Sequence, residues 1–429
     1  MAKITIKGIS GPLIGVITPP GDKSISHRSV ILSSLADGLS TIKGFSRGED
    51  TLSTLNAFKN MGVESTLTSD ILEINGVGIQ GLRGSSTTID AGNSGTTARL
   101  LIGLLSGQNF NSALTGDKYL RKRPMRRVVD PLKLMGADIT GENNANNLPL
   151  LINGQKLSAI KYELPVASAQ VKSALILAGL YADGETEIIE PQKTRDHTER
   201  MLKHFEFPLN IIDNTIYVTP AEKLISSELI IPSDISSASF FIVAALINKG
   251  SEIIINNVGL NSARTGVLEL LTRMGGSIEI QNQREECGED VGDLVVKSSD
   301  LRGIEINGED IPRAIDELPV IAAAACFAEG RTVISEAKEL RIKETDRIKA
   351  VTSEFSKLGA EITEFDDGMV INGNQELRGN ICDSWGDHRI AMSVAIAATM
   401  SVGETSINNP ECVNISYPEF FDTLTRLRS

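Results

Sequence analysis

The chain has 429 residues, 41% of them hydrophobic, so we expect two or three domains with real cores rather than a disordered chain. A net charge of −13 disfavours nucleic acid or an anionic membrane as the main partner, while a local basic pocket remains compatible with a small anionic ligand. The sequence has no secretion signal and no run of about 18 apolar residues, which predicts a cytoplasmic protein without a membrane span.

The four cysteines and four histidines lie far apart, with no CxxC and no HExxH motif. This spacing argues against a disulfide framework and against a zinc site. We therefore expect no metal and no other cofactor.

Six segments of similar composition follow one another along the chain. Each begins with small polar or charged residues, continues as a stretch rich in Ala, Leu and Ile, and stops at a glycine. This pattern predicts a buried helix with a polar N-cap and a C-terminal glycine at positive φ. The six predicted helices span residues 23–38, 93–107, 168–184, 233–250, 313–330 and 386–403.

Strand-like stretches dominated by β-branched residues follow these glycines, for example at 185–191, 251–257 and 331–337. A second, more amphipathic helix then follows, as at 346–359, and further alternating strands complete the unit, as at 360–373. The remaining amphipathic examples lie at 50–62, 126–136 and 265–275. A mixed α/β unit thus occurs six times, which predicts two globular halves of three units each.

Two Pro-containing turns mark the expected crossings between the halves. IIPSD at 230–234 precedes the fourth buried helix, and TPPGD at 18–22 precedes the first.

The N-terminal ends of the buried helices carry the polar residues of interest. Free N–H groups and the helix dipole attract anions there, although ordinary N-capping explains any single Ser, Asn or Asp. Capping does not explain Arg28, Arg99 and Arg389, because the dipole disfavours cations in or near a first turn. A bound anion accounts for them, whereas His388 is equally compatible with a core position.

Two basic clusters lie outside these helices. The stretch 118–127 carries six Lys or Arg residues, and in 339–349 four basic residues surround Glu344 and Asp346. The second cluster is also compatible with a solvated helix held by i,i+3 and i,i+4 pairs. Guanidinium groups match carboxylate and phosphate oxygens in a bidentate manner, which favours a substrate that carries both groups.

Several motifs, in order, cover essentially the whole chain. They are PPGDKSISHR, AGNSGTTARLLIGLL, LTGDKYLRKRPMRR, SAQVKSALILAGL, DHTERML, AIDELPVIAAAA, LRIKETDRI and WGDHRIAM. With them the chain resembles the 5-enolpyruvylshikimate-3-phosphate synthases, also called 3-phosphoshikimate 1-carboxyvinyltransferases. SAQVKSA, with Ala169 where other members have a second serine, is similar to the bacterial class II branch.

The resemblance implies an α/β fold, a two-domain inside-out α/β barrel of six βαβαββ repeats with buried parallel helices. One domain would contain both termini and span 1–21 and 231–429, and the other, 22–230, would be inserted into it. The active site would lie in the interdomain cleft of a monomer. No nucleic acid, membrane or metal partner is implied.

The implied reaction transfers the enolpyruvyl group of phosphoenolpyruvate to the 5-hydroxyl of shikimate 3-phosphate and releases phosphate. It proceeds by addition and elimination through a tetrahedral intermediate. By resemblance, Asp316 takes the hydroxyl proton, and Glu344 protonates and later deprotonates the methylene carbon. Lys23 touches both substrates and, with Arg123, Arg347 and Arg389, stabilises the moving charge.

The resemblance also assigns binding residues to each substrate. Those for shikimate 3-phosphate are Lys23, Ser24, Arg28, Ser168, Ala169, Gln170, Thr194, Arg195, Asp316 and Lys343. Those for phosphoenolpyruvate are Lys23, Asn93, Gly95, Arg123, Gln170, Arg347, His388 and Arg389.

Two positions bear on inhibitor and phosphate binding. Many members of the family carry a lysine where this chain has Ile415, so one phosphate contact is missing. Gly95 retains the small residue beside phosphoenolpyruvate, and because an alanine would crowd glyphosate there, we expect at least partial glyphosate inhibition.

Two alternative functions remain. The related UDP-N-acetylglucosamine enolpyruvyl transferases share the fold and the donor, but they place a cysteine on a loop that corresponds to 118–127, where this chain has none. A non-catalytic anion-binding repeat protein does not need the two carboxylates Asp316 and Glu344.

Overall fold

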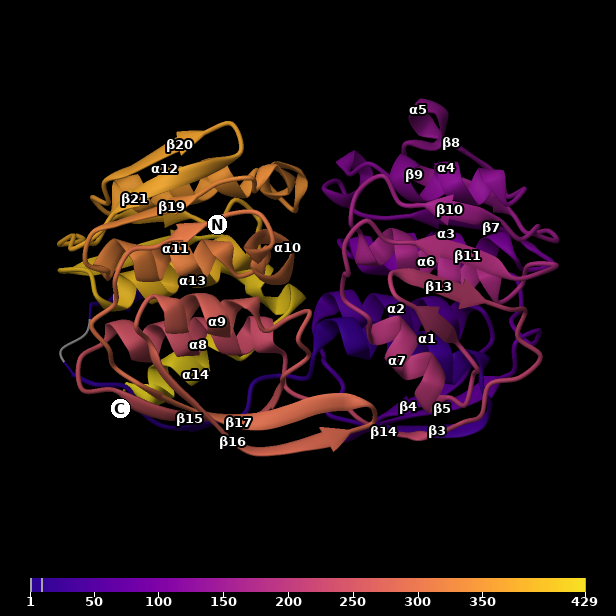
Figure 1. The fold of residues 1–429 in the computed structure, drawn as a ribbon, viewed down its shortest axis with the longest axis horizontal. Helices are drawn as coiled ribbons and strands as arrows, with labels where there is room; N and C mark the ends of the chain where they lie inside the picture. The colour runs from indigo at the N-terminus through magenta and orange to yellow at the C-terminus, as the bar shows by residue number, and fades with distance from the viewer. Residues whose placement is uncertain (1, 9–10, 429) are drawn as a thin grey trace. The chain divides into compact units, whose positions relative to one another are not determined.

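The computed structural model describes residues 2–8 and 11–428, so residues 1, 9 and 10 of the predicted 1–21 segment lie outside the described residues. Two units follow from the packing of the chain (Figure 1). Unit 1 comprises Met1–Pro20, Pro232–Glu285 and Glu289–Ser429, and unit 2 comprises Gly21–Ile231 with Glu286–Gly288. The short segment Glu286–Gly288, predicted within 231–429, thus packs with unit 2, where Ile230 N–H donates to the Cys287 sulfur at 3.2 Å.

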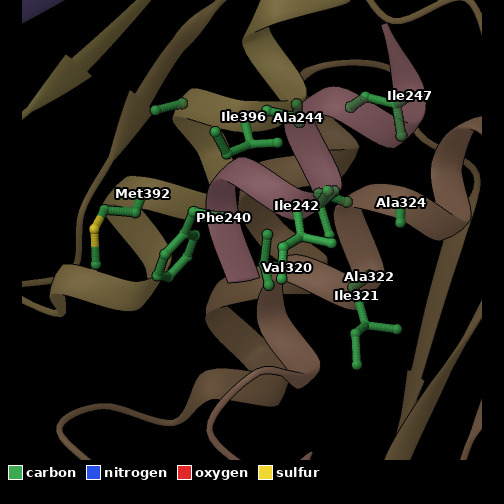
Figure 2. Close-up of a cluster of buried hydrophobic side chains, with 14 of the residues drawn as sticks. Phe240, Ile242, Ala244, Ile247, Val320, Ile321, Ala322, Ala324, Met392 and Ile396 are labelled. Atoms are coloured by element: carbon green, nitrogen blue, oxygen red, sulfur yellow. The ribbon is translucent and has the colours of Figure 1, made fainter. Parts of the chain in front are cut away.

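Three buried helices form the centre of unit 1. They are α8 (Ile235–Ile247), α11 (Leu318–Phe327) and α13 (His388–Thr399), and every residue of α8 and α13 is buried. Figure 2 shows Ile242 of α8 beside Val320 of α11, and Ala244 of α8 beside Ile396 of α13. Burying such side chains contributes about 1.5–3 kcal/mol each, so this apolar cluster is the main source of stability in unit 1.

Further helices of unit 1 bury one face only. They are α9 (Gly266–Arg273), α12 (Arg347–Lys357) and α14 (Phe420–Leu427), with the short α10 (Asp310–Ala314) and the 3₁₀ turns η2 (Lys338–Ile342) and η3 (Pro410–Ile415).

The described strands of unit 1 form three sheets, each containing one parallel pair beside antiparallel ones. The first sheet is β1 (Lys3–Lys7), β23 (Glu404–Asn408) and β22 (Ile381–Asp383). The second is β16 (Ser277–Glu286), β17 (Glu289–Lys297), β15 (Glu252–Gly259) and β2 (Ile14–Ile17). The third is β18 (Glu305–Ile306), β19 (Arg331–Ile334), β21 (Gly368–Asn372) and β20 (Ile362–Phe365).

Unit 2 repeats this plan around α1 (Lys23–Leu35), α3 (Gly95–Ser106) and α6 (Ala169–Gly179). A Cβ on Gly103 of α3 would lie 2.2 Å from the backbone oxygen of Ala174 in α6, so only glycine permits this approach of the two helices. The remaining helices are α2 (Glu49–Asn60), α4 (Arg126–Leu134), α5 (Glu142–Ala145), α7 (His197–His204) and the 3₁₀ turn η1 (Leu120–Lys122).

Three sheets of the described strands surround these helices in unit 2. The first is β14 (Glu228–Ile230), β3 (Asp37–Lys43), β5 (Ile71–Val77) and β4 (Glu64–Leu67). The second is β6 (Ile89–Asp90), β7 (Asn111–Thr115), β9 (Asn147–Asn153) and β8 (Asp138–Gly141). The third is β10 (Lys161–Glu163), β11 (Thr186–Ile189), β13 (Thr215–Val218) and β12 (Asn210–Ile212).

The predicted positive φ of the closing glycines is confirmed at Gly38, Gly250, Gly330 and Gly403, but these glycines lie two or three residues beyond the helix C-caps. The first helix ends at Leu35, and its C-cap Ala36 is already extended, so Gly38 lies inside a strand. Gly107 does cap α3, but with φ −92°. The C-cap residues Ala36 and Gly107 themselves are therefore not left-handed.

The predicted helix 313–330 is interrupted. Helix α10 ends at Ala314 and α11 begins at Leu318, with Pro319 in its first turn. Pro319 lacks the N–H that would donate to the Ile315 carbonyl in a continuous helix. As a result Asp316 lies in the turn between two helices.

The chain has no candidate membrane-spanning helix in its described residues. The four cysteines are free, and residues 2–8 and 11–428 contain no cluster of His, Cys, Asp and Glu suited to a metal ion.

Candidate active site

Arg347 is the centre of a polar cluster in unit 1. It is the first residue of α12 and is 1% exposed. Its Nε donates to Asp387 at 2.8 Å, its Nη1 to Asp316 at 3.2 Å and its Nη2 to Glu344 at 2.6 Å. One guanidinium group therefore joins three carboxylates, including both predicted catalytic ones.

The protonation state of Arg347 follows from this arrangement. Burial by itself lowers the pKa of the guanidinium, but the charges of Asp387, Glu344 and Asp316 outweigh it and raise the pKa above its ordinary value. The planar fork of arginine reaches all three carboxylates at once, which the point charge of a lysine cannot do.

Two further basic residues, Lys343 and Arg389, contact Asp316. Lys343 Nζ lies 3.5 Å from its Oδ1, and Arg389 Nη1 donates to its backbone oxygen at 2.9 Å. The same Arg389 nitrogen lies 3.5 Å from the carboxylate of Glu317, which is fully buried. The turn before α11 thus holds two carboxylates beside basic side chains.

The first turn of α13 contributes the remaining residues of this cluster. Asp387 is the N-cap and accepts from the backbone N–H of Arg389 at 2.8 Å. His388 is buried next to it, with Nδ1 3.9 Å from Asp387. Asp387 therefore both caps α13 and binds Arg347, which links the starts of α12 and α13.

In unit 2, the first turn of α1 carries two predicted residues, Lys23 and Ser24. Asp22 caps the helix by accepting from Ile25 N–H at 2.9 Å, and Lys23 forms an ion pair of 3.0 Å with Asp50 of α2. Ser24 follows in the same turn, and its backbone oxygen accepts from Arg28 at 3.0 Å.

Arg28 is buried and links α1 to two other helices. Its Nε donates to Thr198 Oγ1 at 2.6 Å and its Nη2 to Ser173 Oγ at 2.8 Å. These two hydroxyl groups also form a hydrogen bond of 2.7 Å with each other. The guanidinium position is therefore fixed by α6 and α7 before any ligand binds.

The residues predicted for phosphoenolpyruvate in unit 2 lie together. Arg123 donates to Asn93 at 2.5 Å, and a Cβ on Gly95 would lie 3.3 Å from Arg123 Nη1. Gln170 of α6 accepts a hydrogen bond from Arg99 and donates to Thr96 Oγ1 at 3.1 Å. The starts of α3 and α6 and the residue after η1 thus form one basic and amide-rich surface.

The remaining shikimate 3-phosphate residues lie on α6 and on the loop after β11. Ser168 is the N-cap of α6, accepting from Val171 N–H at 3.4 Å, and Ala169 is its first residue. Thr194 and Arg195 lie in the loop between β11 and α7. The capping alternative considered for Ser168 therefore describes its present hydrogen bond.

Several residues of these clusters were not predicted. Asp387, Glu317, Asp50 and Thr198 hold predicted residues in place, yet only Asp387 had a visible signal, its position just before a helix start. Arg99 was noted as a cation in a first turn but was not assigned to a substrate. Ile415, in place of a lysine, is 7% exposed in η3.

Comparisons with known proteins give a family match. The family described as EPSP synthase (3-phosphoshikimate 1-carboxyvinyltransferase) matches residues 7–424. A protein named 3-phosphoshikimate 1-carboxyvinyltransferase from Geobacter metallireducens is 51% identical over 427 residues, 100% of this chain and 99% of the relative. Another with this name from Geotalea daltonii is 52% identical over 406 residues, 95% of each chain.

Solved structures give the same result. EPSP synthase from Acinetobacter baumannii has a TM-score of 0.89 and 42% identity, over 99% of this chain and 98% of that one. The enolpyruvyl transferase NikO from Streptomyces tendae has a TM-score of 0.81 at 16% identity, over 99% and 97%, and so shares the fold. The predicted fold class is confirmed.

Proposed function

Because the chain belongs to the EPSP synthase family, the 3-phosphoshikimate 1-carboxyvinyltransferases, we propose that its two polar clusters divide the work of this reaction between them. The chain is an enzyme of the shikimate pathway. It transfers the enolpyruvyl group of phosphoenolpyruvate to the 5-hydroxyl of shikimate 3-phosphate and releases phosphate by addition and elimination through a tetrahedral intermediate.

In the addition step, Asp316 takes the proton of the 5-hydroxyl and Glu344 gives a proton to the methylene carbon of phosphoenolpyruvate. The 5-oxygen then bonds to the central carbon, which becomes tetrahedral. Lys343 and Arg347, at 3.5 and 3.2 Å from Asp316 Oδ1, hold the carboxylate in position.

In the elimination step, Glu344 takes a proton back from the new methyl group. The carbon–oxygen bond to phosphate breaks, phosphate leaves with the bonding electron pair, and the double bond is restored. The proton taken by Asp316 leaves with the phosphate. Arg347 and Arg389, with Lys23 and Arg123 of unit 2, stabilise the charge that gathers on the phosphate and carboxylate groups.

Substrate binding falls to residues of both units. In unit 2, Ser24, Arg28 and the start of α6 hold shikimate 3-phosphate, and Thr194 and Arg195 lie in the adjoining sequence after β11. Asn93, Gly95, Arg123 and Gln170 hold phosphoenolpyruvate, with Arg347, His388 and Arg389 of unit 1. Because Arg28 is already held by two hydroxyl groups, little ordering is needed on binding.

The single observation that carries this proposal is the contact of Arg347 with both catalytic carboxylates, Asp316 and Glu344. One buried guanidinium group lies within 3.2 Å of both carboxylates that the reaction needs. An anion-binding protein without chemistry has no use for two carboxylates at its anion site, because they repel the ligand.

Three finer features complete the proposal. SAQVKSA at the start of α6 supports the bacterial class II type. The enzyme acts as a monomer in the cytoplasm. Glyphosate inhibits it at the phosphoenolpyruvate residues around Gly95.

The test is phosphate release from phosphoenolpyruvate by the purified protein, with and without shikimate 3-phosphate. We expect release only with shikimate 3-phosphate, and a loss of at least about a hundredfold in Asp316→Ala. Asp310→Ala is the matched control. Asp310 lies on the neighbouring α10 and forms an ion pair with Arg273, so its loss should leave activity unchanged. Phosphate release with UDP-N-acetylglucosamine instead would contradict shikimate 3-phosphate as the acceptor. Equal loss of activity in both variants would contradict the role of Asp316 as the base.

A further inference from the structure

A buried lysine lies inside α6, two residues after Gln170. Lys172 Nζ is 3.0 Å from Glu190 Oε2 and 2.7 Å from Glu199 Oε1, and the three side chains are 1%, 5% and 3% exposed. Lysine and glutamate are almost never fully buried without partners, so this triad has a defined structural task.

The two glutamates differ in what else they contact. Glu190 directly follows β11, and its second oxygen accepts from Thr194 twice, from the backbone N–H at 3.2 Å and from Oγ1. Glu199 lies on α7, and its second oxygen has no hydrogen-bond partner among the described residues. Burial raises the pKa of Glu199 against the opposing charge of Lys172. Only Glu190 reaches the loop.

The loop between β11 and α7 is irregular. Residues 190–196 form neither helix nor strand, and they lead into α7, which carries Thr198. Through Lys172 and Glu190, the loop is fixed to α6, whose first residues include Ser168 and Gln170. Hydrogen bonds to an ionised acceptor are among the stronger ones available for such fixation.

We propose that Glu190, anchored by Lys172, is a positioning residue for shikimate 3-phosphate that holds Thr194 and Arg195 beside the start of α6. The proposal rests on the proposed function, in which these residues bind that substrate. Glu190 itself does not contact the reacting atoms. It sets the ordering cost of the loop, which the substrate otherwise has to overcome on binding.

Substitution by glutamine separates this role from a merely structural one. Each of Glu190→Gln and Glu199→Gln removes one negative charge beside Lys172 and leaves the side-chain volume unchanged. A glutamine at 190 has one acceptor oxygen for two tasks, binding Lys172 and holding Thr194. A glutamine at 199 can keep its single task. The two variants therefore form a matched pair.

We expect Glu190→Gln to raise the KM for shikimate 3-phosphate about tenfold, the size of a lost hydrogen bond to a charged group. The kcat and the KM for phosphoenolpyruvate should stay within about twofold, because the loop does not carry that substrate's residues. Glu199→Gln should leave all three constants within about twofold. Equal changes in both variants, or a KM for phosphoenolpyruvate that rises as much, would overturn the proposal.

A measurement on the unaltered protein covers the case in which Glu190→Gln does not fold. The Thr194 N–H donates to Glu190, so its hydrogen exchange, followed by NMR without substrate, should be slowed at least about tenfold relative to an unstructured amide. An unprotected Thr194 N–H would overturn the proposal. If the unaltered enzyme releases no phosphate with shikimate 3-phosphate, the proposed function fails, whereas normal activity with unprotected Thr194 contradicts the positioning role alone.

Discussion

Arg347 Nη1 and Asp316 Oδ1 lie 3.2 Å apart, with the guanidinium group buried and the carboxylate at its partly open edge. The same arginine also binds Glu344 and the fully buried Asp387. Its removal therefore leaves three carboxylates without their common cation.

We expect Arg347→Met to lower the free energy of unfolding by about 3–5 kcal/mol, because the substitution leaves buried carboxylates without a cation. Phosphate release should become undetectable. Arg347→Lys should recover part of the stability and little of the activity, since an ammonium group cannot span all three carboxylates. Urea unfolding and the phosphate assay measure both effects.

Arg378→Met is the control for this substitution. Arg378 forms an exposed pair of 3.4 Å with Glu376, and exposed pairs contribute at most about 1 kcal/mol. Equal losses of unfolding free energy in the two variants would contradict the prediction that Arg347 stabilises the fold through its three carboxylate partners.

The pH dependence of stability should include a contribution from His27 of α1. Burial first, then the charges of Lys23 and Arg28, lower the pKa of this imidazole well below its ordinary value of 6.5. The folded protein therefore resists protonation while the unfolded chain accepts a proton. The resulting stability is complete above about pH 6.5 and is lost progressively as the pH falls toward the folded-state pKa.

Urea unfolding of the unaltered protein and of His27→Asn from pH 7.5 to 4.5 checks this expectation. Asparagine places a polar atom near Thr54 Oγ1, which now lies 2.7 Å from Nδ1 of His27, but it does not titrate. The difference in unfolding free energy should shrink below pH 6.5 as the unaltered protein alone loses stability. A constant difference across this range would show that His27 does not contribute.

Gly95→Ala should change inhibitor binding more than folding. The new Cβ would lie 3.3 Å from Arg123 Nη1 and 3.4 Å from Arg99 Nη1, both ends of flexible side chains. Alanine also favours a helical position by about 1 kcal/mol over glycine, so the melting temperature should not fall. We expect the glyphosate inhibition constant to rise at least tenfold and the KM for phosphoenolpyruvate to rise less. Equal rises in both constants would contradict this reading.

Glu354 should control the surroundings of Trp385, the single tryptophan of the chain. The buried carboxylate accepts from Trp385 Nε1 at 2.6 Å, from Asp383 N–H at 2.9 Å and from Lys357 at 2.8 Å. Glu354→Ala should red-shift the tryptophan emission and cost about 2–4 kcal/mol, because several donors lose their acceptor. Glu361→Ala, at an exposed position, is the control and should change neither quantity.

The buried helices could be predicted well because apolar residues of their own sequence occupy all faces of the helix, as in α8. Prediction from the sequence failed where local backbone geometry decided the outcome. The turn that holds Asp316 depends on Pro319, and α1 ends at the extended C-cap Ala36, two residues before Gly38 with its positive φ. The substrate roles of the site residues stay predictions.

Partners from distant segments were the least predictable part of the site. Lys172 stands in an apolar stretch, and nothing near it in sequence indicates that Glu190 and Glu199 neutralise it. Asp387 likewise reaches Arg347 from 40 residues away. Such pairs follow from how helices pack, which composition and periodicity do not encode.

The pairing of β1 with β23 has a consequence for synthesis on the ribosome. Thr5 pairs with Ser406, 401 residues later, and β2 pairs with β15. All of Gly21–Ile231 emerges before either partner strand does, so unit 2 has most of its chain available first. β2 therefore lacks its partner strand until Glu252–Gly259 has been made, and β1 stays without its partner, exposed to chaperones and proteases, until Glu404–Asn408 has been made near the end of synthesis.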